Sequence, residues 1–277
     1  LYGSPSCFRP FCELAGWLPM PRRRRNIKRS AGKRIKRWLS FTLAGFILVT
    51  WIPVLLLRWL EPPATAFMLH QTQGADRGTI RYRWTDWPEL GSAAALAVMA
   101  AEDQKFPQHY GFDVVAIQDA VLDRLDGKSL RGASTITQQV AKNLFLWPGQ
   151  SFLRKGIEAY FTAIIELSWS KKRILEMYLN IAEFGPGIYG IPAASRIYFE
   201  KTPRQLTDAD AALLAAVLPN PKRFQVNRPS EHVRERQLWI LQHMGKMRRY
   251  GGLNLLQGYK ISLVGSRLIF RCDDKQS

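Results

Sequence analysis

The sequence predicts a mainly α-helical protein with one membrane-spanning helix near its N-terminus. Two observations indicate this class. Residues 39–57 contain no charged residue, and residues 88–249 show helical periodicity with short connections and almost no strand pattern. Cap residues before several of the expected helices support the second observation. The chain of 277 residues is long enough to bury a sizeable core.

The N-terminal segment is strongly basic and supplies much of the formal net charge of +18. Residues 22–37 hold ten Lys and Arg and no acid, whereas the sequence beyond residue 60 is only mildly basic. Because the charge is concentrated beside an apolar stretch, we expect a membrane partner and no nucleic acid. We assign residues 1–37 to a basic cytoplasmic segment. Its first nineteen residues look unrelated to the rest, and Met20 is an alternative translation start.

The apolar stretch that follows predicts a transmembrane anchor over residues 38–60. Its nineteen uncharged residues can cross a hydrocarbon core of about 30 Å as a helix. Trp38 and Trp59 lie at its ends, where indoles favour the membrane interface, and Pro53 is tolerable in a membrane helix. A cleavable signal peptide is the alternative, but its apolar core is usually about 7–15 residues and no A-x-A site follows here. The basic block then predicts a cytoplasmic N-terminus and an exported C-terminal part.

Beyond the anchor we expect a linker, a helical domain and a tail. Residues 61–87 form the linker, with one strand-like stretch, TIRYRW; residues 88–250 form the domain and residues 251–277 the tail. N-caps are expected at four hydroxyl residues: Ser134, Ser170, Thr207 and Ser230. The expected helices span residues 88–102, 112–126, 134–146, 151–169, 171–183, 190–199, 207–217 and 230–249.

The first expected helix ends in an unusual way. The apolar run SAAALAVMAA is followed directly by Glu102 and Asp103. Burial disfavours a charged carboxylate, and the C-terminal end of a helix carries partial negative charge, so both effects raise the pKa of an acid placed there. The alternative is an ordinary solvated acid at a helix end.

The helix expected over residues 134–146 has two distinct faces. At 100° per residue, Thr135, Gln139 and Lys142 share one side, opposite an apolar stripe. Hydroxyl and amide donors with one cation, close to a helix N-terminus, suit an anionic oxygen-rich ligand such as a phosphate. A plain solvated face is the alternative. The apolar stripe consists of Ile136, Val140 and Leu144.

The next expected helix carries a cation and an acid one turn apart. Arg154 and Glu158 lie along the edge of the apolar stripe, which suggests either a helix-surface ion pair or an arginine for phosphate beside a second carboxylate. The preceding stretch, LFLWPGQSF, either exposes aromatic residues to a membrane or packs in the core. The stripe expected to be buried is Leu153, Ile157, Phe161 and Ile164.

Two other signals are dismissed. Ser168 and Lys171 match the S-x-x-K of penicillin-binding enzymes, but no K-T-G follows and the remaining chain has no room for that domain. The three cysteines and four histidines show no metal-ligand spacing and no disulfide framework, so we expect no dedicated metal site.

Five ordered blocks carry a family resemblance that covers about residues 85–225. Together they resemble the five blocks of the family 51 glycosyltransferases, which polymerise peptidoglycan and include the transglycosylase module of class A penicillin-binding proteins. Because no penicillin-binding domain follows, the chain resembles the members that consist of this module alone. The blocks are EDQKFPQHYGFD (102–113), GASTITQQVAKN (132–143), RKGIEAYFTAIIE (154–166), KKRILEMYLN (171–180) and GIYGIPAASRIYF (187–199).

The resemblance implies a fold and a reaction. The fold would be a lysozyme-like helical head with a smaller membrane-associated jaw lobe, and the location would be the periplasmic side of a bacterial inner membrane. The reaction would join lipid II to a growing glycan strand. In it, the C4 hydroxyl of GlcNAc attacks C1 of MurNAc with inversion, and undecaprenyl pyrophosphate leaves. Cell-wall synthesis or division proteins would be further partners.

The resemblance also implies roles for particular residues. Glu102 would be the general base, and Glu158 would assist at the pyrophosphate or orient the sugar. A divalent cation, Mg or Mn, can accompany the pyrophosphate in this family, although the sequence offers no ligand cluster for it. The residues expected at the substrate are Asp103, Phe106, His109, Ser134, Thr135, Gln138, Gln139, Lys142, Asn143, Arg154 and Lys155.

Two other functions remain as alternatives to polymerisation. A lysozyme-like hydrolase would also use one glutamate, but it would not need a phosphate-binding face at Lys142 and Arg154. A non-catalytic scaffold for cell-wall synthesis, held by the same anchor, would leave lipid II unchanged. Labelled lipid II distinguishes the three functions, because only a polymerase lengthens the glycan strand.

Overall fold

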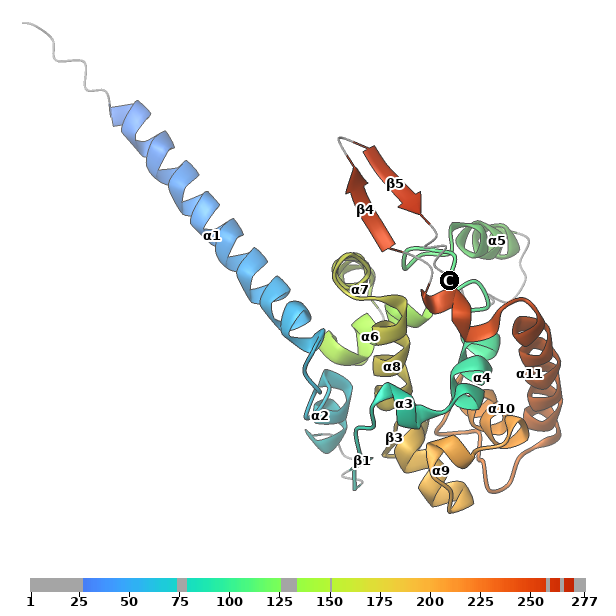
Figure 1. Cartoon of the computed structure of the whole chain (residues 1–277). Coiled ribbons are helices and arrows are strands. Elements are labelled where there is room, and N and C mark those ends of the chain that lie inside the picture. The colour runs from blue at the N-terminus through green and yellow to red at the C-terminus, as the bar shows by residue number, and fades with distance from the viewer. Residues whose placement is uncertain are drawn as a thin grey trace, which may run out of the picture. The chain divides into compact units, whose positions relative to one another are not determined.

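The computed structural model describes residues 27–73, 79–125, 134–149, 151–257, 260–264 and 267–271. The chain divides into two compact units, Leu1–Val49 and Thr50–Ser277, and the boundary falls inside the long helix α1 (Ile27–Leu57; Figure 1). Of the first unit, only the part of α1 before residue 50 is described. Residues 1–26, which include the proposed start at Met20 and part of the basic block, lie outside the described residues.

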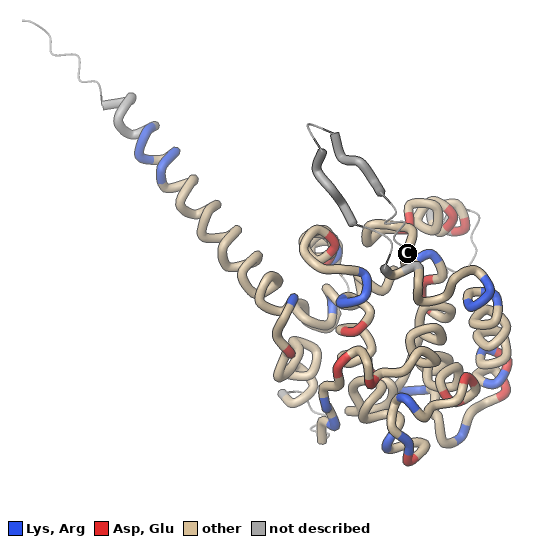
Figure 2. The backbone as a smooth tube through the Cα atoms, in the orientation of Figure 1, with Lys and Arg blue, Asp and Glu red and all other residues tan. Residues whose placement is uncertain are grey.

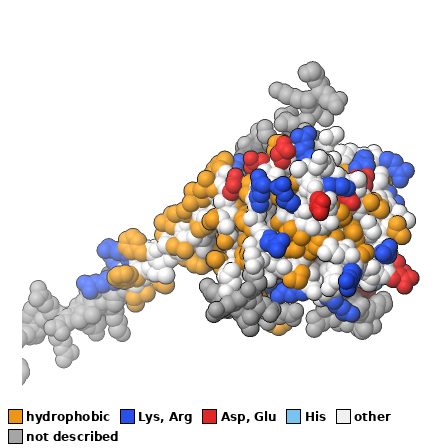
Figure 3. Space-filling model, turned by 90° about the horizontal axis from the view of Figure 1, so that it is seen from below, with side chains coloured by type: hydrophobic (Ala, Val, Ile, Leu, Met, Phe, Trp, Pro, Cys, Tyr) orange, Lys and Arg blue, Asp and Glu red, His pale blue; other side chains and the backbone are white. Residues whose placement is uncertain are grey.

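Helix α1 contains the expected anchor. Residues 33–57 are long and apolar enough to cross a membrane, with a mean hydropathy of 2.1, and the described residues contain one such helix. The helix begins at Ile27, inside the basic segment, and ends at Leu57 rather than at residue 60; Pro53 lies within it. Figure 2 shows its Lys and Arg at the N-terminal turns, and Figure 3 shows hydrophobic side chains along its length. The prediction of one helix able to span a membrane is confirmed.

The second unit is mainly helical, as the sequence predicts. Most of the expected helices are present with ends shifted by at most two residues, and two short 3-10 helices, Pro203–Gln205 and Gly252–Gln257, accompany them. The helix α2 (Ala66–Gln73) lies in the range assigned to a linker. The remaining helices are α3 (Trp87–Leu90), α4 (Ser92–Glu102), α5 (Val114–Leu125), α6 (Ile136–Phe145), α7 (Phe152–Ser168), α8 (Lys171–Ile181), α9 (Ile191–Phe199), α10 (Asp208–Val217) and α11 (Glu231–Arg249).

Helix α4 occupies the centre of the core. Every residue from Ala94 to Ala100 is buried, because small side chains let neighbouring helices approach from several sides. It packs against α10 and α11, as Figure 1 shows, and α10 contributes its own buried alanines, Ala211, Ala212, Ala215 and Ala216. This close packing fixes the position of Glu102 and Asp103 at the C-terminal end of α4.

A second group of helices faces that end of α4. Helix α6 packs against both α7 and α8, and α8 also contacts α4. The apolar stripe of α6 is buried as predicted, at Ile136, Val140 and Leu144. The polar face of α6 therefore points away from this core, toward the acids at the end of α4.

The small sheets are the main difference from the sequence-based prediction. Strand β3 (Ile188–Tyr189) pairs in parallel with β1 (Arg81–Tyr82), which lies in the strand-like stretch, and antiparallel with β2 (Glu183–Gly185). The helix predicted to reach residue 183 ends at Ile181, where β2 follows. Strands of two or three residues are too short to leave a period-2 pattern. In the tail, β4 (Lys260–Val264) and β5 (Arg267–Arg271) form a separate antiparallel pair.

The prediction of one continuous helix over residues 88–102 is wrong. Gly91 separates α3 from α4 with a φ of 78°, in the region that favours glycine. A Cβ added there would lie 2.8 Å from the Pro203 carbonyl oxygen, so the turn also needs the absence of a side chain.

The N-cap of α6 is Thr135 rather than Ser134. The Thr135 side chain accepts from the Gln138 backbone N–H, and the Gln138 side chain accepts from the Thr135 backbone N–H, which completes a capping box. A box needs Glu or Gln three residues after the cap, and only Thr135 satisfies this spacing. The caps predicted at Ser170, Thr207 and Ser230 are confirmed.

The buried face of α7 also differs from the predicted stripe. Leu153 is 73% exposed and Phe152 fully exposed, whereas the buried positions include Glu158 and Thr162. Both inward-facing polar side chains have partners: Glu158 pairs with Arg154 and Lys155, and the Thr162 hydroxyl donates to the Glu158 backbone carbonyl. In the preceding segment Leu144 and Leu146 are buried and Trp147 and Phe152 are exposed, so part of it packs in the core, and contact of the exposed aromatic residues with a membrane stays a prediction.

Within the second unit, side chains of α8 and of the residue after α7 donate hydrogen bonds to backbone carbonyls at and just after the end of α1. The Trp169 indole donates to the Val54 carbonyl at 2.8 Å, and the Arg173 guanidinium donates to those of Leu57 and Leu60. The last carbonyls of a helix lack intrahelical partners, so these contacts satisfy them. The last part of α1, from Thr50, therefore belongs to the second unit.

Candidate active site

The candidate catalytic acid, Glu102, is the last residue of α4. Its side chain is 13% exposed. The Gln139 amide nitrogen donates to its Oε2 at 2.8 Å, and the Tyr178 hydroxyl donates to the Gln139 amide oxygen at 3.0 Å. This chain of two bonds fixes one carboxylate oxygen. The other, Oε1, accepts no hydrogen bond from the described residues.

The surroundings of Glu102 favour its protonated form more than water does. Burial raises the pKa of the Glu102 carboxyl above its ordinary value, and the charge of Asp103 adds to this. The hydrogen bond from Gln139 and the charges of Arg236 and Lys142 oppose the shift without cancelling it. An acid with a raised pKa is a stronger proton acceptor once it is ionised, which suits a general base.

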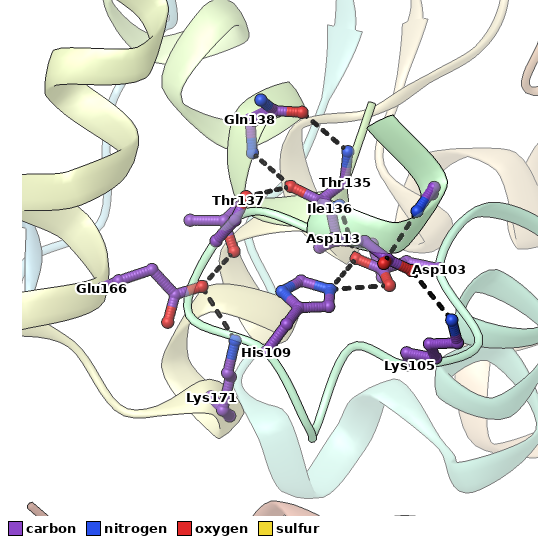
Figure 4. A network of polar contacts seen from close by, with 12 residues as sticks. Asp103, Lys105, His109, Asp113, Thr135, Ile136, Thr137, Gln138, Glu166 and Lys171 are labelled. Atoms are coloured by element: carbon purple, nitrogen blue, oxygen red, sulfur yellow. Dashed lines mark hydrogen bonds and ion pairs between the residues drawn. The ribbon is translucent and has the colours of Figure 1, made fainter. Parts of the chain in front are cut away.

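The neighbouring acid, Asp103, is held by three hydrogen bonds (Figure 4). His109 Nε2 lies 2.9 and 3.0 Å from its two carboxylate oxygens, and the Ile136 backbone N–H donates to Oδ2 at 3.1 Å. Ile136 is the first residue of α6, so Asp103 ties the end of α4 to the start of α6. The contact that His109 makes here is with Asp103, and its other ring nitrogen, Nδ1, is buried with no hydrogen-bond partner among the described residues.

Phe106 lies in the segment between α4 and α5 and is fully buried. The Lys171 ammonium lies 4.5 Å from the centre of its ring and pairs with Glu166 at 2.8 Å. The Thr137 hydroxyl donates to the same Glu166 oxygen (Figure 4). Lys171, which matched the accidental S-x-x-K pattern, thus helps to support the loop between α4 and α5.

Lys142 lies on the polar face of α6, as predicted. Among the described residues its ammonium makes no hydrogen bond or ion pair, and its nearest ring is that of Phe67, at 5.5 Å from the centroid. Burial lowers the pKa of Lys142, and the carboxylates of Glu158 and Glu102 oppose this. A half-buried cation without a bonded partner is suited to an anionic ligand.

Glu158 is deeply buried and paired with two cations of α7. Arg154 Nη1 lies 3.4 Å from its Oε2, and the Lys155 ammonium contacts its Oε1. Arg154 Nε is buried without a partner in the described part of the chain. The pair is therefore more than a helix-surface contact: one carboxylate holds two cations near Lys142, and donors remain for a ligand.

The other predicted site residues divide into two groups. Thr135 and Gln138 are buried and engaged in the α6 cap, Gln138 through its amide oxygen. The Thr135 hydroxyl also donates to the Gly111 carbonyl, so it offers no free donor. Asn143 is half-buried and Ser134 is exposed. Ser134, Glu102 and Asp103 line one cavity of about 300 Å³.

Two residues of this site were not predicted. Tyr178 lies within the fourth sequence block, KKRILEMYLN, so its membership of that block is the sequence feature that marks it. Arg236, on α11, lies outside all five blocks, and no local pattern marks it. Its Nη2 lies 4.0 Å from Glu102 Oε1.

The described residues contain no group of three His, Cys, Asp or Glu placed to hold a metal ion. Glu158, the acid nearest the cations, is already paired with Arg154 and Lys155. A divalent cation that accompanies the pyrophosphate stays a prediction.

The fold and site together define a helical enzyme with one buried acid at a helix end and a cluster of cations beside it. A family model described as Transglycosylase matches residues 70–245. The chain belongs to this transglycosylase family, and it is a peptidoglycan glycosyltransferase. The resemblance seen in the sequence blocks is confirmed.

Similar proteins named biosynthetic peptidoglycan transglycosylase occur in several bacteria. The one from Pasteurella multocida is 51% identical over 221 residues, which are 78% of this chain and 90% of that protein. The one from Shewanella oneidensis is 47% identical over 78% of this chain and 93% of that protein. The one from Pseudomonas syringae is 46% identical over 83% of this chain and 96% of that protein.

Proposed function

We propose that this enzyme polymerises lipid II, with Glu102 as the general base and undecaprenyl pyrophosphate as the leaving group. The observation that carries this proposal is the placement of Glu102 between a cavity and a set of cations. Its Oε2 is held by Gln139, while Oε1 stays open to a substrate. The charge of Lys142 is close enough to affect its titration.

The reaction needs one proton acceptor and one stabilised leaving group. The C4 hydroxyl of the acceptor GlcNAc gives its proton to Glu102 as its oxygen forms a bond to C1 of the donor MurNAc. The bond from C1 to the pyrophosphate oxygen breaks, and attack from the opposite face inverts the configuration. General-base catalysis of this kind contributes about 10²–10⁴-fold in rate.

The cations of α6 and α7 would stabilise the leaving group. Pyrophosphate gains negative charge as its bond to C1 breaks, and Lys142 and Arg154 offer charge-assisted donors for it. Glu158 would act through these cations, because it holds Arg154 and Lys155 in place. The cavity beside Ser134 would receive the acceptor sugar on the other side of Glu102.

The anchor would keep the enzyme at the membrane where its substrate resides. A polyprenyl tail holds lipid II in the bilayer, so an anchored enzyme meets it at a raised effective concentration. The exposed Phe152 and Leu153 at the start of α7 suit contact with lipid near the cations. This is the face that a membrane-associated jaw would present.

The direct test is purified full-length protein with labelled lipid II. We expect polymer that lysozyme can digest, together with released undecaprenyl pyrophosphate. Loss of label from preformed glycan without growth from lipid II would instead support a hydrolase. Unchanged lipid II, with protein that is folded by circular dichroism, would support the non-catalytic scaffold.

The proposed orientation places the catalytic unit in the periplasm, because the ten cations of residues 22–37, which precede the apolar part of α1, stay in the cytoplasm. Protease added to spheroplasts should therefore digest the part of the chain after residue 60. Full protection of that part, in cells where a periplasmic control protein is digested, would contradict this orientation.

A further inference from the structure

Arg236 of α11 reaches across to the end of α4. Its Nη2 donates to the Ala101 carbonyl at 3.1 Å and lies 4.0 Å from Glu102 Oε1. Its guanidinium also lies 5.8 Å from the centre of the Trp239 ring, one turn further along α11. Ala101 and Arg236 are 135 residues apart in the sequence, so the tertiary fold alone creates this contact.

These two distances have different physical consequences. At 3.1 Å, Arg236 donates a hydrogen bond to the Ala101 carbonyl at the end of α4. The last carbonyls of a helix have no N–H of the same helix to bond with, so Arg236 supplies the missing donor. At 4.0 Å, the contact to Oε1 is too long for a hydrogen bond, but the charge is felt through a partly desolvated medium. The lone pairs of Oε1 therefore remain available.

We propose that Arg236 is a positioning residue for the polymerisation reaction: it fixes the end of α4 and places a positive charge beside Glu102 Oε1 without occupying that oxygen. This inference rests on the proposed role of Glu102 as the base. The carboxylate is then controlled from two sides. Gln139 orients Oε2 through a bond, and Arg236 acts on Oε1 through charge alone.

Removal of Arg236 would leave other groups near Glu102 that affect its ionisation. Helix α6 contributes Gln139 and Lys142, α8 contributes the neutral Tyr178 hydroxyl, and Asp103 follows Glu102 directly. Without Arg236, Lys142 is the cation that still affects Glu102, and Asp103 opposes it. The ionised form of Glu102 should then become harder to reach.

The test is the pH dependence of kcat/KM for Arg236→Gln and Arg236→Lys in the full-length protein with labelled lipid II. We expect the acid limb of Arg236→Gln to move up by about 0.5–1 pH unit, which is about a three- to tenfold loss on that limb. Activity should recover toward wild type at higher pH, where Glu102 is ionised in both proteins. Arg236→Lys keeps the charge and should restore most of the profile.

Arg248→Gln is the matched control, because Arg248 lies on the same helix and pairs with Asp208 instead. Thermal unfolding of each variant identifies loss of folded protein. A loss that is equal at every pH, or a Lys variant no better than Gln, would reduce Arg236 to a structural contact and overturn the proposal. Glu102→Gln in the same assay separates the two hypotheses: if it stays active, the base assignment itself fails.

Discussion

The two buried glutamates of the site have opposite surroundings. Glu102, at the end of α4, has one amide donor and a guanidinium at 4.0 Å. Glu158, in the second turn of α7, contacts two cations directly through both of its oxygens. Both acids come from helices that the sequence predicts. The fold gives the negative charge of Glu102 few compensating contacts, whereas it places two cations in contact with Glu158.

This difference indicates a division of roles. Both carboxylate oxygens of Glu158 contact cations, so neither is open to a substrate, whereas Oε1 of Glu102 accepts no hydrogen bond from the described residues. Burial raises the pKa of the Glu102 carboxyl, which favours its uptake of a proton. The contrast supports the proposal that Glu102 takes the proton and that Glu158 places the cations for the leaving group.

The strongest test of this division is Glu102→Gln. The amide keeps the shape and can still meet Gln139, but it cannot take a proton at neutral pH. Polymerisation should fall by at least about 100-fold, the lower end of general-base contributions, while affinity for a phosphoglycolipid inhibitor changes little. Glu89→Gln, at an exposed position, is the control. Near wild-type turnover in Glu102→Gln would remove it from the chemistry.

The next largest effect is expected on the cationic side. Lys142→Ala and Arg154→Ala should each lose a charge-assisted contact worth about 1.5–3 kcal/mol, seen as lower kcat/KM at limiting lipid II. The fold should survive, because neither side chain belongs to an apolar stripe. Lys172→Ala, an exposed cation on α8, should behave as wild type. Unchanged kcat/KM in either site variant would exclude that residue from substrate binding.

Glu158→Gln sharpens the contrast with Glu102→Gln. Loss of its charge releases Arg154 and Lys155, so turnover and inhibitor affinity should fall together, by about tenfold if one charged hydrogen bond of about 1.5 kcal/mol is lost. Turnover and inhibitor affinity should be measured on the same protein preparations. A pure loss of turnover with intact affinity would instead indicate that Glu158 takes part in the chemistry.

The sequence predicts one half of this comparison better than the other. The run of small residues before Glu102 implies a buried helix with an acid at its end, and the structure confirms the burial and its effect on the pKa. For Glu158, the helical periodicity predicts a position at the edge of the apolar stripe. The pattern of apolar residues cannot show that nearby cations neutralise a carboxylate and allow it to be buried. Only the tertiary packing shows that Glu158 faces inward.

Contacts between distant segments account for most of what the sequence could not predict. Arg236 reaches Ala101 from α11, and Gly91 breaks a helix because Pro203 approaches it. Neither contact leaves a local pattern. The Thr135 cap, by contrast, was available in the sequence, since the spacing of Gln138 distinguishes it from Ser134.

The smallest expected effect is on stability, and it again separates the two glutamates. Burial raises the pKa of Glu102 in the folded protein, so its ionisation costs stability above that pKa and nothing below the value of the unfolded chain. Glu102→Gln removes a charge that also opposes the dipole of α4, which is worth about 0.3–1 kcal/mol. The variant should therefore be more stable than wild type at neutral pH. The advantage should shrink as the pH falls through the raised pKa, since wild-type Glu102 then becomes neutral as well.

Glu158→Gln should show the reverse, a loss of stability at neutral pH, because two cations lose their buried partner. Denaturant unfolding of both variants at pH 7 and pH 4 measures these differences, and a destabilised Glu102→Gln at pH 7 would show that the Glu102 carboxylate is compensated after all.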